Sequence, residues 1–402
     1  MELKFSPSVA QIQKVSYAKE AEEKFLLDCG DGCSPYGCSE KVAQALREAD
    51  IHDVTAYPHG FELKDAIIRR WQKYAPLTYD MLYLHNSGMD AIACVNTIFS
   101  HTGAAVVGIC PQFTDYVLSA CCHGFDYRPV YLKQEENFQL MPERVVAAID
   151  DAVSLVYLDN PNNPTGQSVS LDSMRIILNK AKEVGACIIS DEAYGDYLAP
   201  EDSAITLVNE YDNLIVMRSF SKGTGLAGMR AAYVAASPEI IAQIDKVSNP
   251  YCINGIGRRL AVAALEDTAF VEENRRRIAA AKQALRSCTG GALSMAATLD
   301  SCSICLLTHK DKNCDLAKLF ASYGVKVVSG SDFEGLGTNS VRLRLPPQEQ
   351  EKALQETILR VKEHSIEEAT KNLDPTDIQG LQRLMNEKRK MQDLRTLHIS
   401  IN

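Results

Sequence analysis

The sequence predicts an α/β protein with a mostly parallel sheet between helices and a second, smaller α+β domain. Three observations lead to this class. The chain has 402 residues, which exceeds one ordinary domain, and 46% of them are hydrophobic, which is enough for a large core. Between about residues 81 and 237, short apolar runs alternate with helical stretches, as in strand–helix–strand units. These runs show little apolar–polar alternation, which is typical of parallel strands buried on both faces.

The first 255 residues are expected to contain an N-terminal arm and the large domain. Residues 1–50 are expected to form the arm and part of the small domain, with a helix that ends near Asp50. Residues 51–255 are expected to form the large domain. Its predicted strands are MLYLH, AAVVGI, SLVYLD, ACIIS, NLIVM and AAYVAA.

The remaining residues are expected to form the small domain and an extension. Residues 256–365 begin with helical sequence up to Ser287 and continue with three β-like runs, CSICLLTH, VKVVSG and NSVRLRL. A helix is predicted from Glu349 to about Lys371. Residues 366–402 are expected to be a helical extension, whose second, short helix starts at the cap-like sequence Asp374-Pro375-Thr376-Asp377.

Charge and apolar patterning argue against several classes of function. The net charge of −10 argues against nucleic acid as the main ligand. No apolar stretch reaches the roughly 18 residues needed to span a bilayer, and the first residues lack the apolar region of a signal peptide. Cys94, Cys187 and Cys305 lie in apolar runs, where a thiol acts as a small hydrophobe. We therefore expect a cytoplasmic protein without membrane contact.

Polar and glycine-rich peptides follow the predicted strands directly. They are HNSGMD, PQFTDY, NPNNPTG, DEAYGDY and SFSKGTG. In open α/β sheets, ligands bind beyond the carboxyl ends of the strands, where such peptides converge. The sequence therefore predicts one ligand site at this edge of the sheet.

The peptide SFSKGTG carries groups that suit an aldehyde cofactor with a phosphate. The hydroxyls of Ser219 and Ser221, nearby backbone amides and Arg230 can hold a phosphate. Lys222, beside that phosphate, can form a Schiff base with an aldehyde. The alternative for Lys222 is an ordinary exposed surface lysine.

A buried carboxylate is predicted one strand away. Asp191 follows the apolar run ACIIS directly, where an unpaired carboxylate is costly, so it needs a cationic partner. A protonated pyridine nitrogen is such a partner, and Tyr194 can donate to a phenolic oxygen of the same ring. Alternatively, Asp191 is a helix N-cap, and NPNNPTG is only a polar turn.

Taken in order, these motifs resemble those of the fold-type I, class I/II aminotransferases. The motifs are Asn163-Pro164-Thr165-Gly166, Asp191-Glu192-Ala193-Tyr194, and Ser219-Phe220-Ser221-Lys222 with Arg230. The resemblance covers about residues 25–362 and is strongest to the histidinol-phosphate aminotransferase-related branch. It implies a seven-stranded, mostly parallel sheet in the large domain, pyridoxal 5'-phosphate (PLP) as cofactor, and a homodimer with shared active sites.

The resemblance also implies a set of cofactor-binding residues, which are Ser87, Gly88, Met89, Phe113, Asn163, Asp191, Tyr194, Ser219, Ser221, Lys222, Arg230 and Tyr57. Three of these, Lys222, Asp191 and Tyr194, would be catalytic, and Lys222 would be the Schiff-base lysine and proton shuttle. Phe113 would stack on the cofactor ring. Tyr57 would reach the cofactor phosphate of the neighbouring subunit.

Substrate residues follow from the same resemblance. Arg342 would bind the substrate α-carboxylate through a two-pronged hydrogen bond, and Asn163 would assist; Arg344, on the same face of the strand, is the alternative to Arg342. Histidinol-phosphate aminotransferases carry a second arginine after a Gly-aliphatic strand. Here that stretch is GVKVVSGSDF, with Val and Ser at the place of the arginine, and the N-terminal motif CGDGCSPYG is also unusual.

We therefore expect a PLP-dependent transfer of the amino group of an L-amino acid to a 2-oxo acid. The alternatives are histidinol-phosphate aminotransferase, amino-acid decarboxylase, β-eliminating lyase and hydroxyarginine cyclase on the same fold. A regulatory PLP-binding module is not expected, because only about 25 residues precede the family-like region. No metal site is expected from the CxxC at 302–305, because no second Cys pair or His cluster accompanies it. No dinucleotide site is expected from the GxGxxG at 223–228, because that motif does not open a helix here.

Overall fold

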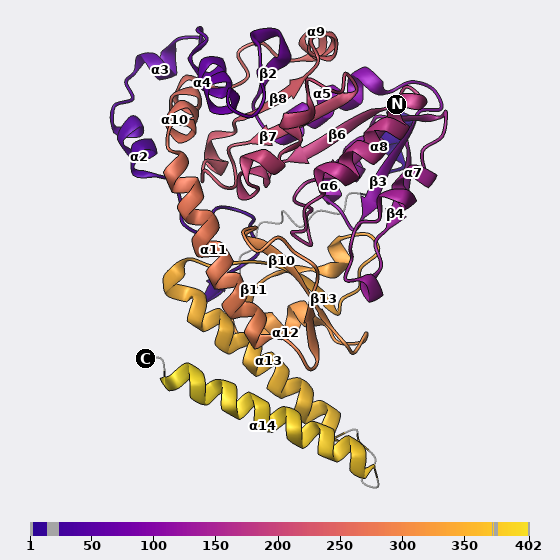
Figure 1. Cartoon of the computed structure of the whole chain (residues 1–402), viewed down its shortest axis with the longest axis vertical. Coiled ribbons are helices and arrows are strands. Elements are labelled where there is room, and N and C mark those ends of the chain that lie inside the picture. Colours follow the sequence, from indigo (N-terminus) through magenta and orange to yellow (C-terminus); the bar gives the residue numbers. More distant parts are fainter. Residues whose placement is uncertain (1–2, 14–23, 372, 374–376, 401–402) are drawn as a thin grey trace.

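The computed structural model describes residues 3–13, 24–371, 373 and 377–400, without the side chains of residues 381 and 393–400. Its larger part is a sheet covered by helices on both faces (Figure 1). A smaller α+β part lies beside it, and the long helix α11 (Thr268–Cys288) extends from one part into the other. The C-terminal helix lies at the end of the molecule away from the large sheet.

The large sheet has seven strands in the order β2-β8-β7-β6-β5-β3-β4. Only β8 runs antiparallel to its two neighbours, whereas the strands from β7 to β4 pair in parallel. The strands are β2 (Leu82–His85), β3 (Ala105–Cys110), β4 (Asp126–Tyr131), β5 (Val153–Asp159), β6 (Cys187–Glu192), β7 (Leu214–Ser219) and β8 (Ala232–Ala236). The predicted fold class, a mostly parallel seven-stranded sheet plus a smaller α+β part, is confirmed.

The six strands predicted from apolar runs all belong to this sheet, and β4 is the one that sequence reasoning missed. β3, β6, β7 and β8 are buried along their whole length, so each shows as a continuous apolar run. β4 lies at the edge, is half-exposed, and contains Pro129, which an edge strand tolerates. Its sequence DYRPVY therefore lacks the apolar signal.

Helices cover both faces of the large sheet and pack against alternating strand residues. In β5, Val156 and Leu158 belong to one apolar core, whereas Leu155 and Tyr157 belong to another. The helices of this part are α2 (Glu40–Arg47), α3 (His52–Thr55), α4 (Glu62–Trp71), α5 (Gly88–Phe99), α6 (Thr114–Cys122), α7 (Pro142–Ala147), α8 (Leu171–Glu183), α9 (Pro238–Val247) and α10 (Gly255–Leu265). The arm contributes α1 (Pro7–Ala10), which contacts α6.

The smaller part contains an antiparallel sheet of order β12-β13-β10-β9 and its own apolar core. Its strands are β9 (Leu293–Met295), β10 (Ile304–His309), β12 (Val328–Ser329) and β13 (Ser340–Arg344), and its helices include α12 (Leu316–Ser322) and α13 (Glu351–Lys371). The predicted run VKVVSG divides between two sheets. Its first half is β11 (Val325–Lys326), which pairs in parallel with β1 (Leu27–Asp28) of the N-terminal segment.

The pairing of β1 with β11 agrees with the expectation that residues 1–50 contribute to the small domain. The exact domain boundaries stay a prediction. The extension contains α14 (Ile378–Ser400), which packs on α13 and is 23 residues long, not short as predicted. The predicted cap at Asp374-Pro375-Thr376-Asp377 lies mostly outside the described residues. Among the residues described, no helix combines the length and the apolar character that crossing a membrane requires.

Candidate active site

The loops that follow the parallel strands enclose a cavity of about 160 Å³ at the carboxyl edge of the large sheet. All the predicted cofactor residues except Ser87 and Tyr57 line it. The lining residues are Gly88, Met89, Ile92, Phe113, Asp159, Pro161, Asn163, Asp191, Ala193, Tyr194, Met217, Ser219, Ser221, Lys222, Ala227 and Arg230. These residues come from five separate segments, so the predicted convergence of the loops is found in the fold.

Asp191 lies near the end of β6 and faces this cavity. Its Oδ2 accepts a short hydrogen bond from Tyr157 Oη, and its Oδ1 accepts one from the amide of Ala193 at 2.9 Å. Burial raises the pKa of Asp191 to about 6. Within the described part of the chain, no ion pair joins Asp191 to a cationic side chain. A cationic group in the cavity would therefore supply the charge that the carboxylate lacks.

Lys222 follows β7 and is nearly enclosed. Burial lowers the pKa of its amine, and the positive charge of Arg342 lowers it further. The amine lies over the ring of Tyr194, with Nζ at 5.4 Å from the ring centroid. A lysine with a lowered pKa presents more of its neutral, nucleophilic form at neutral pH.

The start of α5 also borders the cavity, and Gly88 lies against Met217, the residue paired with Asp191 on the neighbouring strand. Ser87 is the N-cap of α5, and its Oγ accepts from the amide of Asp90 at 3.1 Å. The first amides of a helix have no partner within the helix and attract anions. Gly88 packs closely here, because a Cβ at this position would lie 2.9 Å from the end of the Met217 side chain.

Arg230 completes the cationic side of the cavity. It has a left-handed backbone (φ 53°), and its guanidinium donates to the carbonyl of Ala227 at 2.9 Å. On the neighbouring loop, the hydroxyl of Ser219 accepts from the amide of Ser221 at 3.1 Å. Helix amides, hydroxyls and a guanidinium together make a site suited to a phosphate.

Arg342 reaches the site from β13 of the smaller part. It is 1% exposed, its NH1 donates to Asn163 Oδ1 at 3.3 Å, and its NH2 donates to the carbonyl of Gly30. Arg344 is directed differently, because its guanidinium donates to the carbonyls of Asp28 and Leu345. This difference supports Arg342 over Arg344 as the carboxylate-binding residue.

Sequence reasoning missed Asp159, a second buried carboxylate in the cavity. It lies opposite Asp191 on the neighbouring strand. Its carboxylate accepts from the amide of Asn163 at 2.9 Å, from the side chain of Asn162 at 2.9 Å, and from the amide of Phe113 at 3.3 Å. Burial raises its pKa to about 7. The available signal was its position as the last residue of the predicted strand SLVYLD.

Gly32, in the unusual CGDGCSPYG motif, was also missed. A Cβ at Gly32 would lie 2.1 Å from Tyr194 Oη and 3.1 Å from Lys222 Nζ. The backbone of this loop therefore lies directly against two predicted catalytic residues, and only glycine leaves room for it. The charges of its neighbours Cys33 and Asp31 raise the pKa of Lys222, whereas the charge of Arg342 lowers it.

Tyr57, another predicted site residue, does not line the cavity of its own chain. Its side chain is exposed, and its ring packs against Tyr251 with the centroids 5.1 Å apart. It follows the short helix α3, far along the chain from the loops that form the cavity. Its predicted role in a neighbouring subunit stays a prediction.

Comparisons with known proteins bear on this site. The family described as aminotransferase class I and II matches residues 24–360. Histidinol-phosphate aminotransferase of Halalkalibacterium halodurans is 33% identical over 245 residues, which are 60% of this chain and 64% of that protein. The enzyme of the same name from Bacillus subtilis is 30% identical over 240 residues, or 59% and 65% of the two chains. The aligned region thus spans less than two thirds of these relatives.

Solved structures show the same fold. A double mutant of Thermus thermophilus aspartate aminotransferase superposes with a TM-score of 0.77 at 21% identity, covering 90% of this chain and 100% of that one. The histidinol-phosphate aminotransferase of Clostridium acetobutylicum superposes with a TM-score of 0.73 at 22% identity, covering 84% of this chain and 100% of that one. Both are similar in fold over nearly their whole length.

Proposed function

The chain belongs to the class I and II aminotransferase family, and from this premise we propose that it uses PLP to transfer the amino group of an L-amino acid to a 2-oxo acid. The observation that carries the proposal is that Lys222 and Asp191 line one cavity, and that Arg342 donates a hydrogen bond to Asn163 of the same lining. These residues supply an amine, a buried anion and a guanidinium, which are the three groups that such a reaction requires.

The residues of the cavity fit PLP. Asp191 is a buried carboxylate without an ion-pair partner among the described residues, which suits a pyridinium nitrogen. The start of α5 and Arg230 suit a phosphate. When bound, PLP supplies an aldehyde that captures amines and a ring that withdraws electrons from the substrate.

Lys222 is proposed to hold the cofactor and to move the proton of the reaction. Its lowered pKa keeps part of the amine neutral, so Nζ can accept the proton from the substrate Cα and return it elsewhere. Tyr194, whose ring lies beneath Nζ, and Asn163 are proposed to bind the phenolic oxygen of the cofactor. Phe113 is proposed to cover the ring.

Asp191 is proposed to keep the pyridine nitrogen protonated. An ionised carboxylate at hydrogen-bond distance stabilises the charged ring, which strengthens the electron-withdrawing effect on the substrate. The hydrogen bond from Tyr157 favours the ionised form of Asp191, because a phenol donates to a carboxylate. Tyr157 therefore acts as a positioning residue for this carboxylate.

The proposed substrate is an α-amino acid whose carboxylate binds Arg342. The names of the relatives favour histidinol phosphate as the second candidate. That substrate lacks an α-carboxylate and carries a phosphate, for which a second guanidinium is favourable. In this chain Val328 stands at the expected place of that arginine, paired with Arg342 across the β12–β13 ladder. This departure supports an ordinary amino acid.

We also propose a homodimer with shared sites. Large apolar side chains are exposed along residues 51–61, namely Ile51, Val54, Tyr57 and Phe61. A concentration of exposed apolar residues on one segment is typical of a protein interface. Tyr57 lies within this segment, and we propose that it binds the cofactor phosphate of the partner subunit, as the family resemblance implies.

The proposal is tested by cofactor binding and by an amino-donor screen. The wild-type protein should bind about one PLP per chain and become yellow. Lys222→Ala should still bind PLP noncovalently but should not be trapped with it by borohydride, and transamination should fall by several orders of magnitude. Lys318→Ala, which alters an exposed lysine, is the control. A wild-type protein indifferent to PLP, or an active Lys222→Ala, would contradict the proposal.

The donor screen distinguishes the two candidate substrates. Common amino acids and histidinol phosphate are offered with 2-oxoglutarate or pyruvate as acceptor. We expect the highest kcat/KM for an amino acid, and Arg342→Ala should raise KM for it without altering the spectrum of the bound cofactor. A higher kcat/KM for histidinol phosphate than for every amino acid would overturn the substrate assignment but not the family.

A further inference from the structure

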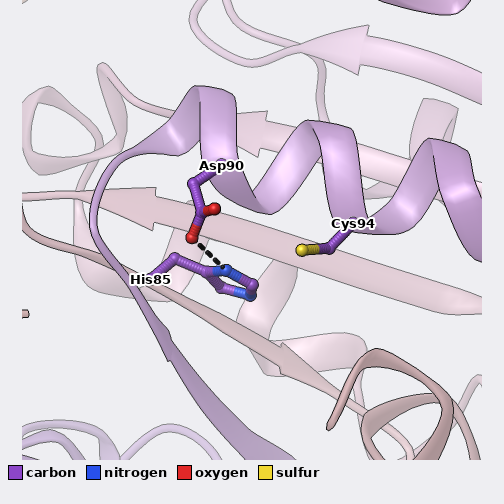
Figure 2. A group of neighbouring side chains, drawn as sticks. All are labelled: His85, Asp90 and Cys94. Carbon is purple, nitrogen blue, oxygen red and sulfur yellow. Dashed lines mark hydrogen bonds and ion pairs between the residues drawn. The ribbon is translucent and has the colours of Figure 1, made fainter. Parts of the chain in front are cut away.

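Three side chains of metal-binding type meet at the junction of β2 and α5 (Figure 2). His85 is the last residue of β2, and Asp90 and Cys94 lie one turn apart on α5, so the helix presents both on one face. Each residue offers one ligand atom, and the nitrogen, oxygen and sulfur atoms all lie within 4.8 Å of one another. Among the described residues, this is the one place where three or more side chains of this type come so close together.

The hydrogen bonds of this group leave one buried atom unsatisfied. His85 Nδ1 and Asp90 Oδ2 are 2.9 Å apart, and Asp90 Oδ2 also accepts from the amide of Asn86 at 3.3 Å. The other ring nitrogen, His85 Nε2, is buried and has no hydrogen-bond partner among the described residues. A buried polar atom without a partner costs about 1–3 kcal/mol, so the group has coordinating capacity that the protein alone does not use.

We propose that His85, Asp90 and Cys94 bind a divalent transition metal ion of the zinc class. An imidazole, a carboxylate and a thiolate form a mixed ligand set that suits zinc better than calcium or magnesium. The charges also balance, because a 2+ ion with one thiolate, one carboxylate and a neutral imidazole is neutral overall. Binding releases the thiol proton of Cys94 to solvent, and no oxidation or reduction is involved.

Binding requires the ligand atoms of the three side chains to move closer together. Zinc–ligand bonds of roughly 2.0–2.3 Å place tetrahedral ligand atoms about 3.3–3.8 Å apart, compared with the limit of 4.8 Å found here. The side chain of Asp90 is 17% exposed, which gives the ion a path from solvent. The fourth position is left for water, as at zinc sites with three protein ligands.

The location gives the ion a structural consequence. His85 and Asp90 flank Asn86, Ser87, Gly88 and Met89, the segment proposed to bind the cofactor phosphate. An ion held at both ends of this segment would fix its conformation. The metal site itself does not rest on the proposed function, since it is measured by metal content alone.

The test uses the full chain, purified under reducing conditions and freed of metal by a chelator. Zinc is then titrated against a chromophoric chelator, and cobalt is added in a parallel sample. We expect one ion per chain, and a cobalt spectrum with tetrahedral d–d bands and a thiolate-to-cobalt charge-transfer band. Absence of binding by the wild-type protein, or a cobalt spectrum without the thiolate band, would overturn the proposal.

Two cysteine variants localise the ion. Cys94→Ala should weaken binding by more than about tenfold, since even outer-shell partners of metal ligands contribute roughly 10–100-fold. Cys187→Ala is the matched control, because Cys187 is also a buried thiol of the same apolar core but lies outside the group. Equal binding by Cys94→Ala and wild type would show that the ion lies elsewhere and would refute the site. If Cys94→Ala does not fold, the cobalt spectrum of the wild-type protein decides.

Discussion

An ion triad of Arg218, Glu192 and Asp196, next in the chain to residues of the proposed active site, allows a stability prediction to be worked from the structure. Arg218, in β7, donates from NH1 to Glu192 Oε2 at 2.8 Å and from NH2 to Asp196 Oδ1 at 2.5 Å. Its guanidinium also lies 5.3 Å from the centre of the Trp71 ring. Glu192 follows Asp191 directly and Arg218 precedes Ser219, so the triad joins the starts of two cofactor loops.

Arg218→Met removes the cation and keeps most of the side-chain volume. Glu192 is fully buried, and without Arg218 its remaining donors among the described residues are the hydroxyl of Ser203 at 2.6 Å and the amide of Ala204 at 2.7 Å. Removing one partner of a buried ion pair typically destabilises a protein by about 3–5 kcal/mol. This corresponds to an increase in the unfolding equilibrium constant of roughly one hundredfold to a few thousandfold.

The assay is equilibrium urea unfolding of the protein without cofactor, followed by circular dichroism and by tryptophan fluorescence. Trp71 is the single tryptophan of the chain and contacts Arg218, so its fluorescence reports on this site. Arg175→Met, which alters a partly exposed pair with Glu210, should change stability by at most about 1 kcal/mol.

Two outcomes would refute this reasoning. The first is that Arg218→Met lowers the free energy of unfolding by no more than Arg175→Met does. The second concerns the double variant Arg218→Met, Glu192→Gln, which removes the uncompensated charge and should recover part of the lost stability. A further loss of several kcal/mol in the double variant would show that the charge on Glu192 is not the cause.

Three further predictions concern the cofactor site. PLP affinity should be highest well above pH 6 and should fall as the pH drops through about 6, because Asp191, with a pKa of about 6, must be ionised to pair with the ring. Tyr157→Phe removes a donor to that carboxylate, so the fall in equilibrium binding should shift to a higher pH, and an unshifted profile would contradict the role of Tyr157. Asp159→Asn leaves a buried donor facing other donors, so PLP affinity measured by titration should fall about tenfold or more; unchanged affinity would show that Asp159 does not position the loops. Mixing Lys222→Ala with Tyr57→Phe should restore activity through hybrid dimers with one intact site, whereas activity that follows each subunit separately would exclude shared sites.

The sequence predicted the parts of the fold that depend on neighbouring residues. β3, β6 and β7 are short apolar runs followed at once by polar loops, so strand and loop could be placed together. The edge strand β4 could not, because its half-exposed residues carry no such run. The division of VKVVSG between two sheets depends on β1, which pairs with it from the other end of the chain.

In the candidate site, too, the sequence predicted the residues that lie in local motifs and missed those whose role depends on residues far away in the chain. Lys222, Asp191 and Asn163 lie in motifs with characteristic local sequence. The contact of Gly32 with Tyr194 joins residues that are far apart in the chain, and nothing in the local sequence CGDGC specifies it. Asp159 was missed because its role depends on donors from two loops, at Phe113 and Asn163, which only the folded sheet brings to it.

The loop that carries Gly32 is anchored to the smaller part, although it contacts residues of the larger one. β1 pairs with β11, Arg344 donates to the carbonyl of Asp28, and Arg342 donates to the carbonyl of Gly30. If the smaller part rotated as a rigid body relative to the large sheet, the loop attached to it would move with it, and Gly32 would move towards or away from Lys222. Arg342, the residue proposed to bind the substrate carboxylate, is one of the residues that attach this loop to the smaller part. A substrate carboxylate that moves the guanidinium of Arg342 would also move the loop that lies against Lys222. Substrate binding at Arg342 would thus change the position of Gly32 next to the catalytic lysine.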